Sequence, residues 1–180
     1  MTMSLDGFVN DRSGDLSPLY PDLAALRRTK MLQDSIRKTG AVVMGRGAYD
    51  VANGDFTGYE FQVPLFIVTR HPPKVRPKGE NARLKVRFVT EGLDRAMALA
   101  KRAAGRNDVT VVGGADILHQ VLAKGLADEL LVGIVPIFLG GGLRMFDGLD
   151  GMGIRLERRR VMESPGRTDV VFRVVKPSRR

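Results

Sequence analysis

The segment Val42-Val-Met-Gly-Arg-Gly-Ala-Tyr49 joins a short β-branched run to a glycine and then to a helix-like stretch. It predicts a strand that ends at Met44, a turn at Gly45 and a helix that begins near Arg46. The segment Val111-Val-Gly-Gly-Ala-Asp116 shows the same order of features. Each turn alone is equally consistent with an ordinary connection. Together they predict an α/β sheet whose strand ends expose helix N–H groups to an anionic ligand.

Apolar runs and helical stripes extend this interpretation along the chain. Apolar residues at i, i+3, i+4 and i+7 predict a helix from Leu93 that stops at Gly105, and a second stripe from Ile117 stops at Gly125. Pro21 and Asp22 are expected to open a third helix. Short runs bounded by Gly, Pro or Asp predict strands at residues 41–44, 64–69, 86–90, 108–112, 129–138, 155–163 and 169–175.

The order of these elements indicates the fold class. Residues 39–125 run strand, helix, strand, strand, helix, strand, helix, as in an α/β fold with right-handed crossovers. The last two strands follow without a helix, and their alternation predicts a half-solvated antiparallel hairpin. We therefore expect a mostly parallel central sheet flanked by helices, with a C-terminal antiparallel hairpin, in a single domain over residues 1–180.

Composition narrows the function classes. The chain has 180 residues, no Cys and two His, which excludes disulfides and thiolate metal sites and makes a histidine metal cluster unexpected. It has no apolar run of the ~20 residues that a membrane helix needs, and its start lacks the layout of a signal peptide, so a cytoplasmic protein is expected. The charge of +9 is spread along the chain. We interpret it as a solvated surface rather than a nucleic-acid site.

Several motifs in order resemble one family. They are Met3-Ser-Leu-Asp-Gly-Phe-Val9, the Val-Met-Gly-Arg turn, Ile67-Val-Thr-Arg70, the Val-Gly-Gly-Ala turn, and Pro136-Ile-Phe-Leu-Gly-Gly-Gly-Leu-Arg-Met-Phe146. This set resembles the dihydrofolate-reductase-like family. It is most similar to the branch typified by the reductase domain of bacterial riboflavin biosynthesis and its stand-alone relatives. In that family the first strand normally begins about half a dozen residues before Ser-Leu-Asp-Gly, whereas here only Met1, Thr2 and Met3 precede it.

The resemblance implies NADPH-dependent hydride transfer, in which the cofactor supplies the hydride and the protein supplies orientation and a proton. It implies that the 2′-phosphate lies near Thr69 and Arg70, with Arg46 as a further partner, and that Val9 and Asp6 line the nicotinamide. Ala48 stands where folate enzymes usually have Thr, and Asp116 where a basic residue is common, so NADH stays open as the cofactor. The residues implied for the pyrophosphate are Gly45, Arg46, Gly113, Gly114 and Ala115.

The substrate side is less specific. Asp22 matches the buried acid of folate reductases, where a carboxyl binds a pterin edge, but it is equally typical of a helix N-terminus. Residues 52–62 form either a mobile flap or a surface loop packed by its own aromatic residues. Gly140 to Gly142 either cradle a phosphate or turn the chain. His71 and His119 are interpreted as surface or packing residues, which leaves Asp6 and Asp22 as the candidate catalytic carboxyls.

The expected function is reduction of a heterocyclic, pterin- or pyrimidine-like small molecule. The narrower alternative is a riboflavin-pathway reductase of a ribosylamino-pyrimidine phosphate. Alternatives from other classes are a non-catalytic nucleotide-binding module and a nucleic-acid binder. The relatives implied by the resemblance are often dimers, and the long apolar run at residues 130–138 suggests pairing across a two-fold axis. A homodimer without a membrane partner is therefore expected.

Overall fold

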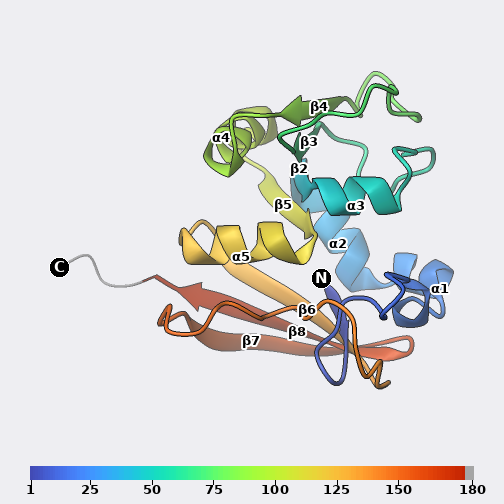
Figure 1. Ribbon diagram of the computed structural model, residues 1–180, viewed down its shortest axis with the longest axis vertical. Coiled ribbons are helices and arrows are strands. Elements are labelled where there is room, and N and C mark those ends of the chain that lie inside the picture. The colour runs from blue at the N-terminus through green and yellow to red at the C-terminus, as the bar shows by residue number, and fades with distance from the viewer. Residues whose placement is uncertain (177–180) are drawn as a thin grey trace. The chain divides into compact units, whose positions relative to one another are not determined.

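The computed structural model describes residues 1–176 and has the predicted α/β architecture (Figure 1). Its contacts divide the chain into two compact units. One unit is Lys30–Leu118, and the other joins Met1–Thr29 to the segment from His119 onward. Each unit has its own four-stranded sheet. The prediction of one domain over residues 1–180 stays a prediction.

The Lys30–Leu118 unit contains a wholly parallel sheet in the order β4-β3-β2-β5. The strands are β2 (Thr39–Gly45), β3 (Leu65–Val68), β4 (Val86–Val89) and β5 (Asp108–Gly113). β2 lies in the middle because its residues are β-branched or apolar and almost all buried. Each strand matches a run predicted from the sequence to within about two residues, which confirms the parallel part of the fold.

Two helices of this unit follow the predicted apolar stripes. They are α4 (Leu93–Ala104) and α5 (Ala115–Ala123), the second of which continues beyond the unit. The others are α2 (Lys30–Lys38) and α3 (Arg46–Val51). α4 buries the expected face against β2 and β3 and ends where Gly105 takes a positive φ of 62°. The sequence interpretation missed α2, whose strongly polar composition hid its apolar stripe. That stripe places Leu32 and Ile36 against the core.

Residues 52–62 form a packed loop. Phe56 and Phe61 are 2% and 5% exposed and lie in the same core cluster as Tyr49 and β2. The loop is closed by backbone bonds between Phe56 N and Lys78 O and between Lys78 N and Gly54 O. Burial raises the pKa of the Tyr59 phenol. The surface-loop alternative therefore describes this segment, because its aromatic side chains are already buried in its own unit.

The other unit holds a mixed sheet in the order β1-β6-β8-β7. Its strands are β1 (Thr2–Ser4), β6 (Glu129–Val135), β7 (Arg155–Ser164) and β8 (Arg167–Val175), and β7 and β8 form the predicted antiparallel hairpin. The strand predicted at 129–138 ends earlier, since Pro136 has no N–H for the ladder. Both edges of β6 are paired at Gly133 and Ile134, so this part of the run has no free edge for a second chain.

β7 departs from the expected half-solvated pattern. It is exposed on both faces from Arg155 to Val161, and its register with β8 shifts between Arg158 and Arg160. Edge strands are commonly protected from pairing with other chains by charges and bulges. Arg158, Arg159 and Arg160, with the register shift beside them, are features of this kind on the edge strand β7. In residues 1–176 no helix has the length and apolar character needed to cross a membrane.

The remaining helices of this unit are short. The 3₁₀ helix η1 (Ser17–Leu19) places Leu19 in the core, where it is 1% exposed. α1 (Leu23–Arg27) follows, with Asp22 as its N-cap. The sequence suggested that Pro21 opens this helix. In the structure Pro21 instead precedes the N-cap and lies outside the first turn.

Candidate functional site

Three strand ends lie side by side at one edge of the parallel sheet. β2 pairs with both β3 and β5, with Gly45 opposite Val68 and Met44 opposite Gly113. The carboxyl ends of parallel strands meet at the same edge, which is where α/β sheets bind ligands. The structure therefore brings together the predicted cofactor residues of this unit, which are Gly45, Arg46, Thr69, Arg70, Gly113, Gly114 and Ala115.

The glycines of this edge have different physical roles. A Cβ on Gly45 would lie 2.6 Å from Ile117 Cγ1, so this glycine lets α5 approach β2. A Cβ on Gly114 or Gly47 would meet nothing within 4 Å, so there the backbone is open to a ligand. Gly113 has a φ of 121° and is joined to Gly114 by a cis peptide bond.

Arg46 is held in place at this edge. Its Nε donates to Asp50 Oδ1 at 2.7 Å and its Nη1 donates to the His71 carbonyl at 2.5 Å. The Arg46 side chain remains 39% exposed. No residue among 1–176 pairs with its Nη2, so an anion can bind there. The guanidinium thus links α3 to the segment after β3.

Thr69 and Arg70 follow β3 beside this arginine. The Thr69 hydroxyl lies 3.2 Å from the His71 amide, which donates to it. Arg70 is exposed, and its side chain forms no hydrogen bond or ion pair with residues 1–176. An unpaired guanidinium near a constrained one is a suitable partner for a phosphate group.

α5 adds a helix N-terminus to the same edge. Its first intrahelical bond is from Leu118 N to Gly114 O, so the N–H groups before Leu118 have no partner in the helix. α3 has six residues and therefore a weak dipole. Ala115 is buried at 1% exposure, and Asp116 lies exposed in the first turn of α5. Asp116 adds a negative charge close to the helix N-terminus and disfavours a second anion there.

Asp6 lies in the other unit, where its carboxylate joins two loops. Oδ1 accepts hydrogen bonds from Ser4 Oγ at 2.5 Å and from Leu139 N at 3.1 Å, and Oδ2 accepts one from Gly140 N at 2.8 Å. These bonds, the Ser4 bond foremost, lower the pKa of Asp6 to about 2. The side chain is therefore ionised at neutral pH.

Val9 and Asp22 belong to the same unit as Asp6. Val9 is 6% exposed, and its amide donates to Leu143 O at 2.8 Å. Asp22 is exposed, and its Oδ1 accepts a hydrogen bond from Ala25 N at 2.7 Å, the geometry of a helix N-cap. Contacts of these residues with a nicotinamide or a substrate stay predictions.

Sequence reasoning missed the side chains that, like Asp6, join the segment after β1 to the segment after β6. Asn10 Oδ1 accepts a bond from Leu143 N at 2.8 Å, and Arg12 Nη2 donates to Gly140 O at 3.0 Å. Arg144 lies over the Phe8 ring at 4.5 Å from its centre. The sequence signal that could have indicated this pairing is the presence of two turn motifs, Asp6-Gly7 and Gly140 to Gly142. The His119 ring contacts the Met145 carbonyl at 2.7 Å, consistent with a packing role.

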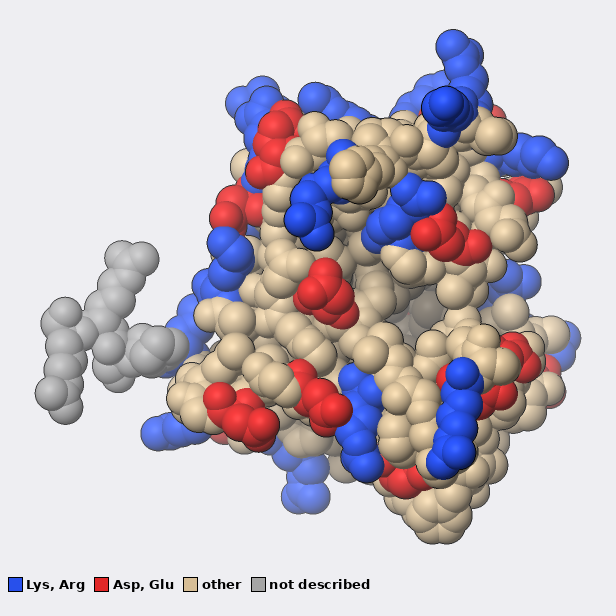
Figure 2. Space-filling model, in the orientation of Figure 1, with Lys and Arg blue, Asp and Glu red and all other residues tan. Residues whose placement is uncertain are grey.

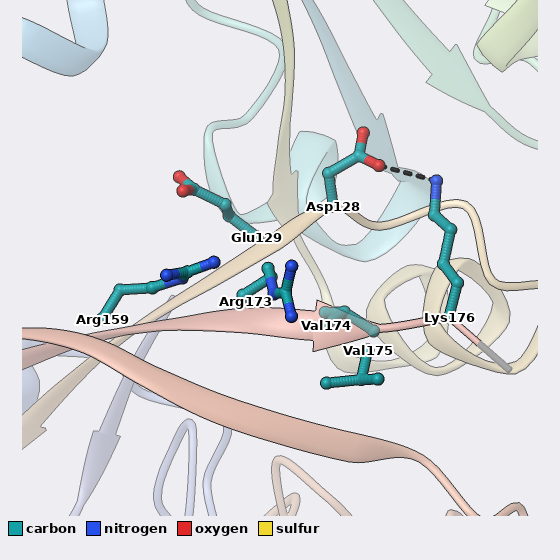
Figure 3. Close-up of a pocket in the computed structure, with 7 residues that line it drawn as sticks. All are labelled: Asp128, Glu129, Arg159, Arg173, Val174, Val175 and Lys176. Atoms are coloured by element: carbon teal, nitrogen blue, oxygen red, sulfur yellow. Dashed lines mark hydrogen bonds and ion pairs between the residues drawn. The ribbon is translucent and has the colours of Figure 1, made fainter. Parts of the chain in front are cut away.

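A pocket of about 570 Å³ lies away from these residues, at the end of β8 (Figure 3). Its charges largely neutralise one another: Lys176 Nζ pairs with Asp128 at 2.7 Å, and Arg173 pairs with Glu157 at 2.8 Å. No predicted site residue lines it, and its mixed charge indicates no ligand class. The pocket is lined by Asp128, Glu129, Arg159, Arg173, Val174, Val175 and Lys176.

On one face of the molecule the basic side chains do not gather into one stripe. On the face in Figure 2, Lys and Arg are interspersed with Asp and Glu. A stripe of one sign is the usual footprint of a nucleic-acid site, and this face lacks one. Within residues 1–176 there is also no group of three or more acidic, His or Cys side chains that could hold a metal ion.

The parallel sheet, the glycine turns and the mixed sheet with its C-terminal hairpin define a dihydrofolate-reductase-like protein. The profile of the RibD C-terminal domain family matches residues 1–168, so the chain belongs to that family. A curated relative, the uncharacterized protein YwjB of Bacillus subtilis (strain 168), is 23% identical over 150 residues. That alignment covers 83% of this chain and 81% of YwjB.

Solved structures show the same fold. A putative riboflavin biosynthesis protein from Shewanella sp. PV-4 aligns with a TM-score of 0.77 and 21% identity, over 98% of this chain and 97% of that chain. The diaminohydroxyphosphoribosylaminopyrimidine deaminase/5-amino-6-(5-phosphoribosylamino)uracil reductase of Thermotoga maritima aligns with a TM-score of 0.70 and 21% identity, over 97% of this chain and 55% of that one. Dihydrofolate reductase from Enterococcus faecalis, complexed with NADP(H), aligns with a TM-score of 0.61 and 13% identity, over 97% and 94% of the two chains.

Proposed function

We propose that this chain is an NADPH-dependent reductase of a heterocyclic, pyrimidine- or pterin-like small molecule. The observation that carries the proposal is the convergence of three turns at one edge of the parallel sheet. There Gly114 leaves the backbone open, Arg46 is held by two hydrogen bonds, and Arg70 is exposed. Backbone N–H groups and guanidinium groups are the partners that a phosphorylated cofactor needs.

The residues present fit such a cofactor except Asp116, whose charge opposes an anion at the start of α5. Space beside Gly114 and Gly47 admits a ligand against the backbone, and we assign the pyrophosphate to these turns with Gly45, Gly113 and Ala115. We assign the 2′-phosphate to Arg46, Thr69 and Arg70. The bound cofactor supplies the hydride. The chain's own residues bind and orient it, and Val9 remains the predicted neighbour of the nicotinamide.

Family membership favours the narrower candidate, a reductase of a ribosylamino-pyrimidine phosphate. The Thermotoga maritima protein of the same fold is named as a 5-amino-6-(5-phosphoribosylamino)uracil reductase. Because the identity to that structure is 21%, the substrate is a proposal for this chain.

Turnover tests the proposal. Loss of NADPH absorbance is followed with the purified chain and either the ribosylamino-pyrimidine phosphate or dihydrofolate. We expect NADPH oxidation that depends on one of these substrates, with a KM for NADPH that Arg46→Ala together with Arg70→Ala raises. Tight NADPH binding without turnover of either substrate class would instead support a non-catalytic nucleotide-binding module.

A further inference from the structure

Two loops of the unit that contains β1 are paired along their length. We call residues 4–12 the N-terminal loop and residues 137–145 the glycine loop; Figure 1 shows them following β1 and β6. Their backbones are joined by Leu5 N to Ile137 O at 2.9 Å, Val9 N to Leu143 O at 2.8 Å and Met145 N to Gly7 O at 2.9 Å. The N-terminal loop therefore takes its shape from the glycine loop.

The Asp6 carboxylate lies between these backbone bonds. It accepts hydrogen bonds from the backbone amides of Leu139 and Gly140, which lie between Ile137 and Leu143 in the glycine loop. The Ser4 hydroxyl holds the same carboxylate from the N-terminal side. Three of its four or so lone-pair sites are thereby occupied, which leaves little capacity to carry a proton to a substrate.

Part of the glycine run of this loop is explained by the same pairing. A Cβ on Gly142, whose φ is 124°, would lie 2.0 Å from Asn10 O, and a Cβ on Gly141 would lie 2.3 Å from Arg12 Nε. The backbone of Asn10 thus accounts for Gly142 without a bound phosphate, whereas the atoms near Gly141 belong to the exposed Arg12 side chain, which can move. The two loops therefore meet with no space between them at Gly142.

We infer that Asp6 is a positioning residue, whose carboxylate joins the N-terminal loop to the glycine loop and so holds Val9 in place for the cofactor. Only the part that concerns the cofactor rests on the proposed function. The joining of the two loops by Asp6 rests on the contacts described above. Asp6 is then neither the proton donor nor a substrate ligand. Its role is shared with Asn10, whose side chain accepts the Leu143 amide.

Amide hydrogen exchange of the cofactor-free protein tests the joining of the loops. Asp6→Asn should speed exchange roughly tenfold at Leu139 and Gly140, and also at Val9, Leu143 and Met145, which do not contact Asp6. The matched control is Asp11→Asn, because Asp11 accepts bonds only within its own turn, from Ser13 and Asp15. Faster exchange confined to Leu139 and Gly140, or none, overturns the inference.

Kinetics with NADPH distinguish positioning from proton transfer. For a positioning role, Asp6→Asn and Asn10→Ala each weaken NADPH binding and lower kcat, and the double variant is no worse than the more affected single variant. For a proton donor, Asp6→Asn lowers kcat with unchanged NADPH affinity, while Asn10→Ala resembles the wild type; this result overturns the inference. If the wild type does not bind NADPH, the proposed function and the cofactor part of the inference both fail, and hydrogen exchange still decides whether Asp6 joins the loops.

Discussion

Replacement of Gly45 by Ala tests why a glycine stands at the first turn of the candidate site. Its φ of −81° and ψ of 165° are open to any residue, so the substitution creates no backbone strain. The added Cβ lies 2.6 Å from Ile117 Cγ1, whereas carbon atoms pack best at about 3.5–4.0 Å, so the two must separate by about 1 Å. Ile117 is 3% exposed and has little room to move.

We expect Gly45→Ala to lower the free energy of unfolding by about 1–3 kcal/mol, the usual cost of overpacking a core. The matched control is Gly47→Ala, two residues along, where a Cβ meets nothing within 4 Å and helix propensity improves. It should leave stability unchanged or raise it by up to about 1 kcal/mol. Urea unfolding, with a check that the slope is unchanged, measures both variants.

The double variant Gly45→Ala with Ile117→Ala identifies the cause. Ile117→Ala alone should cost about 2–5 kcal/mol, because it leaves a cavity. In that background the added Cβ fills space, so Gly45→Ala should then cost less than about 0.5 kcal/mol. Additive losses, or a Gly45→Ala variant as stable as the wild type, would refute the steric explanation.

Three further predictions concern the other unit and the assembly. Asp22→Ala should lower the free energy of unfolding by about 1 kcal/mol because it removes the cap on Ala25 N, while Asp22→Asn keeps the cap. If Asp22 also contacts the substrate, Asp22→Asn lowers kcat/KM about tenfold in a turnover assay. A wild-type kcat/KM would remove Asp22 from the site. The lowered pKa of Asp6 means that its stabilising bonds are complete above its ordinary value of 3.8 and are lost as the pH falls toward about 2, so Asp6→Asn should flatten acid unfolding in that window when it is followed by circular dichroism. Light scattering at micromolar concentration should give the mass of a homodimer, and a monomer mass would end that prediction.

Much of the fold was predictable because its signals are local. The stripe from Leu93 to Ala100 and the stop at Gly105 define α4, and the two strand-to-helix turns mark the edge of the parallel sheet. α2 was missed because its few apolar side chains are separated by charged ones. The exposure of β7 was missed because alternation predicts one buried face only when another layer covers it.

The candidate site was predictable only in part, for a related reason. Glycines and arginines at strand ends indicate an anion-binding site, and each such signal lies within one short segment of the sequence. The role of Asp6 depends on amides more than 130 residues away, and no local pattern shows such partners. From the sequence, the glycine run at residues 140–142 was consistent with either a phosphate cradle or a turn of the chain. The structure explains Gly142 by the backbone oxygen of Asn10, which leaves no room for a Cβ.

Calorimetric titration of the wild-type chain with NADPH and with NADH tests the central claim most directly. Because Arg46 and Arg70 are expected to bind the extra phosphate, NADPH should bind more tightly, and Arg70→Ala should bring its affinity close to that of NADH. Each lost charge-assisted bond should weaken NADPH by about 1–3 kcal/mol. Equal affinities for the two cofactors, or NADPH affinity unchanged by Arg46→Ala and Arg70→Ala, would contradict the account.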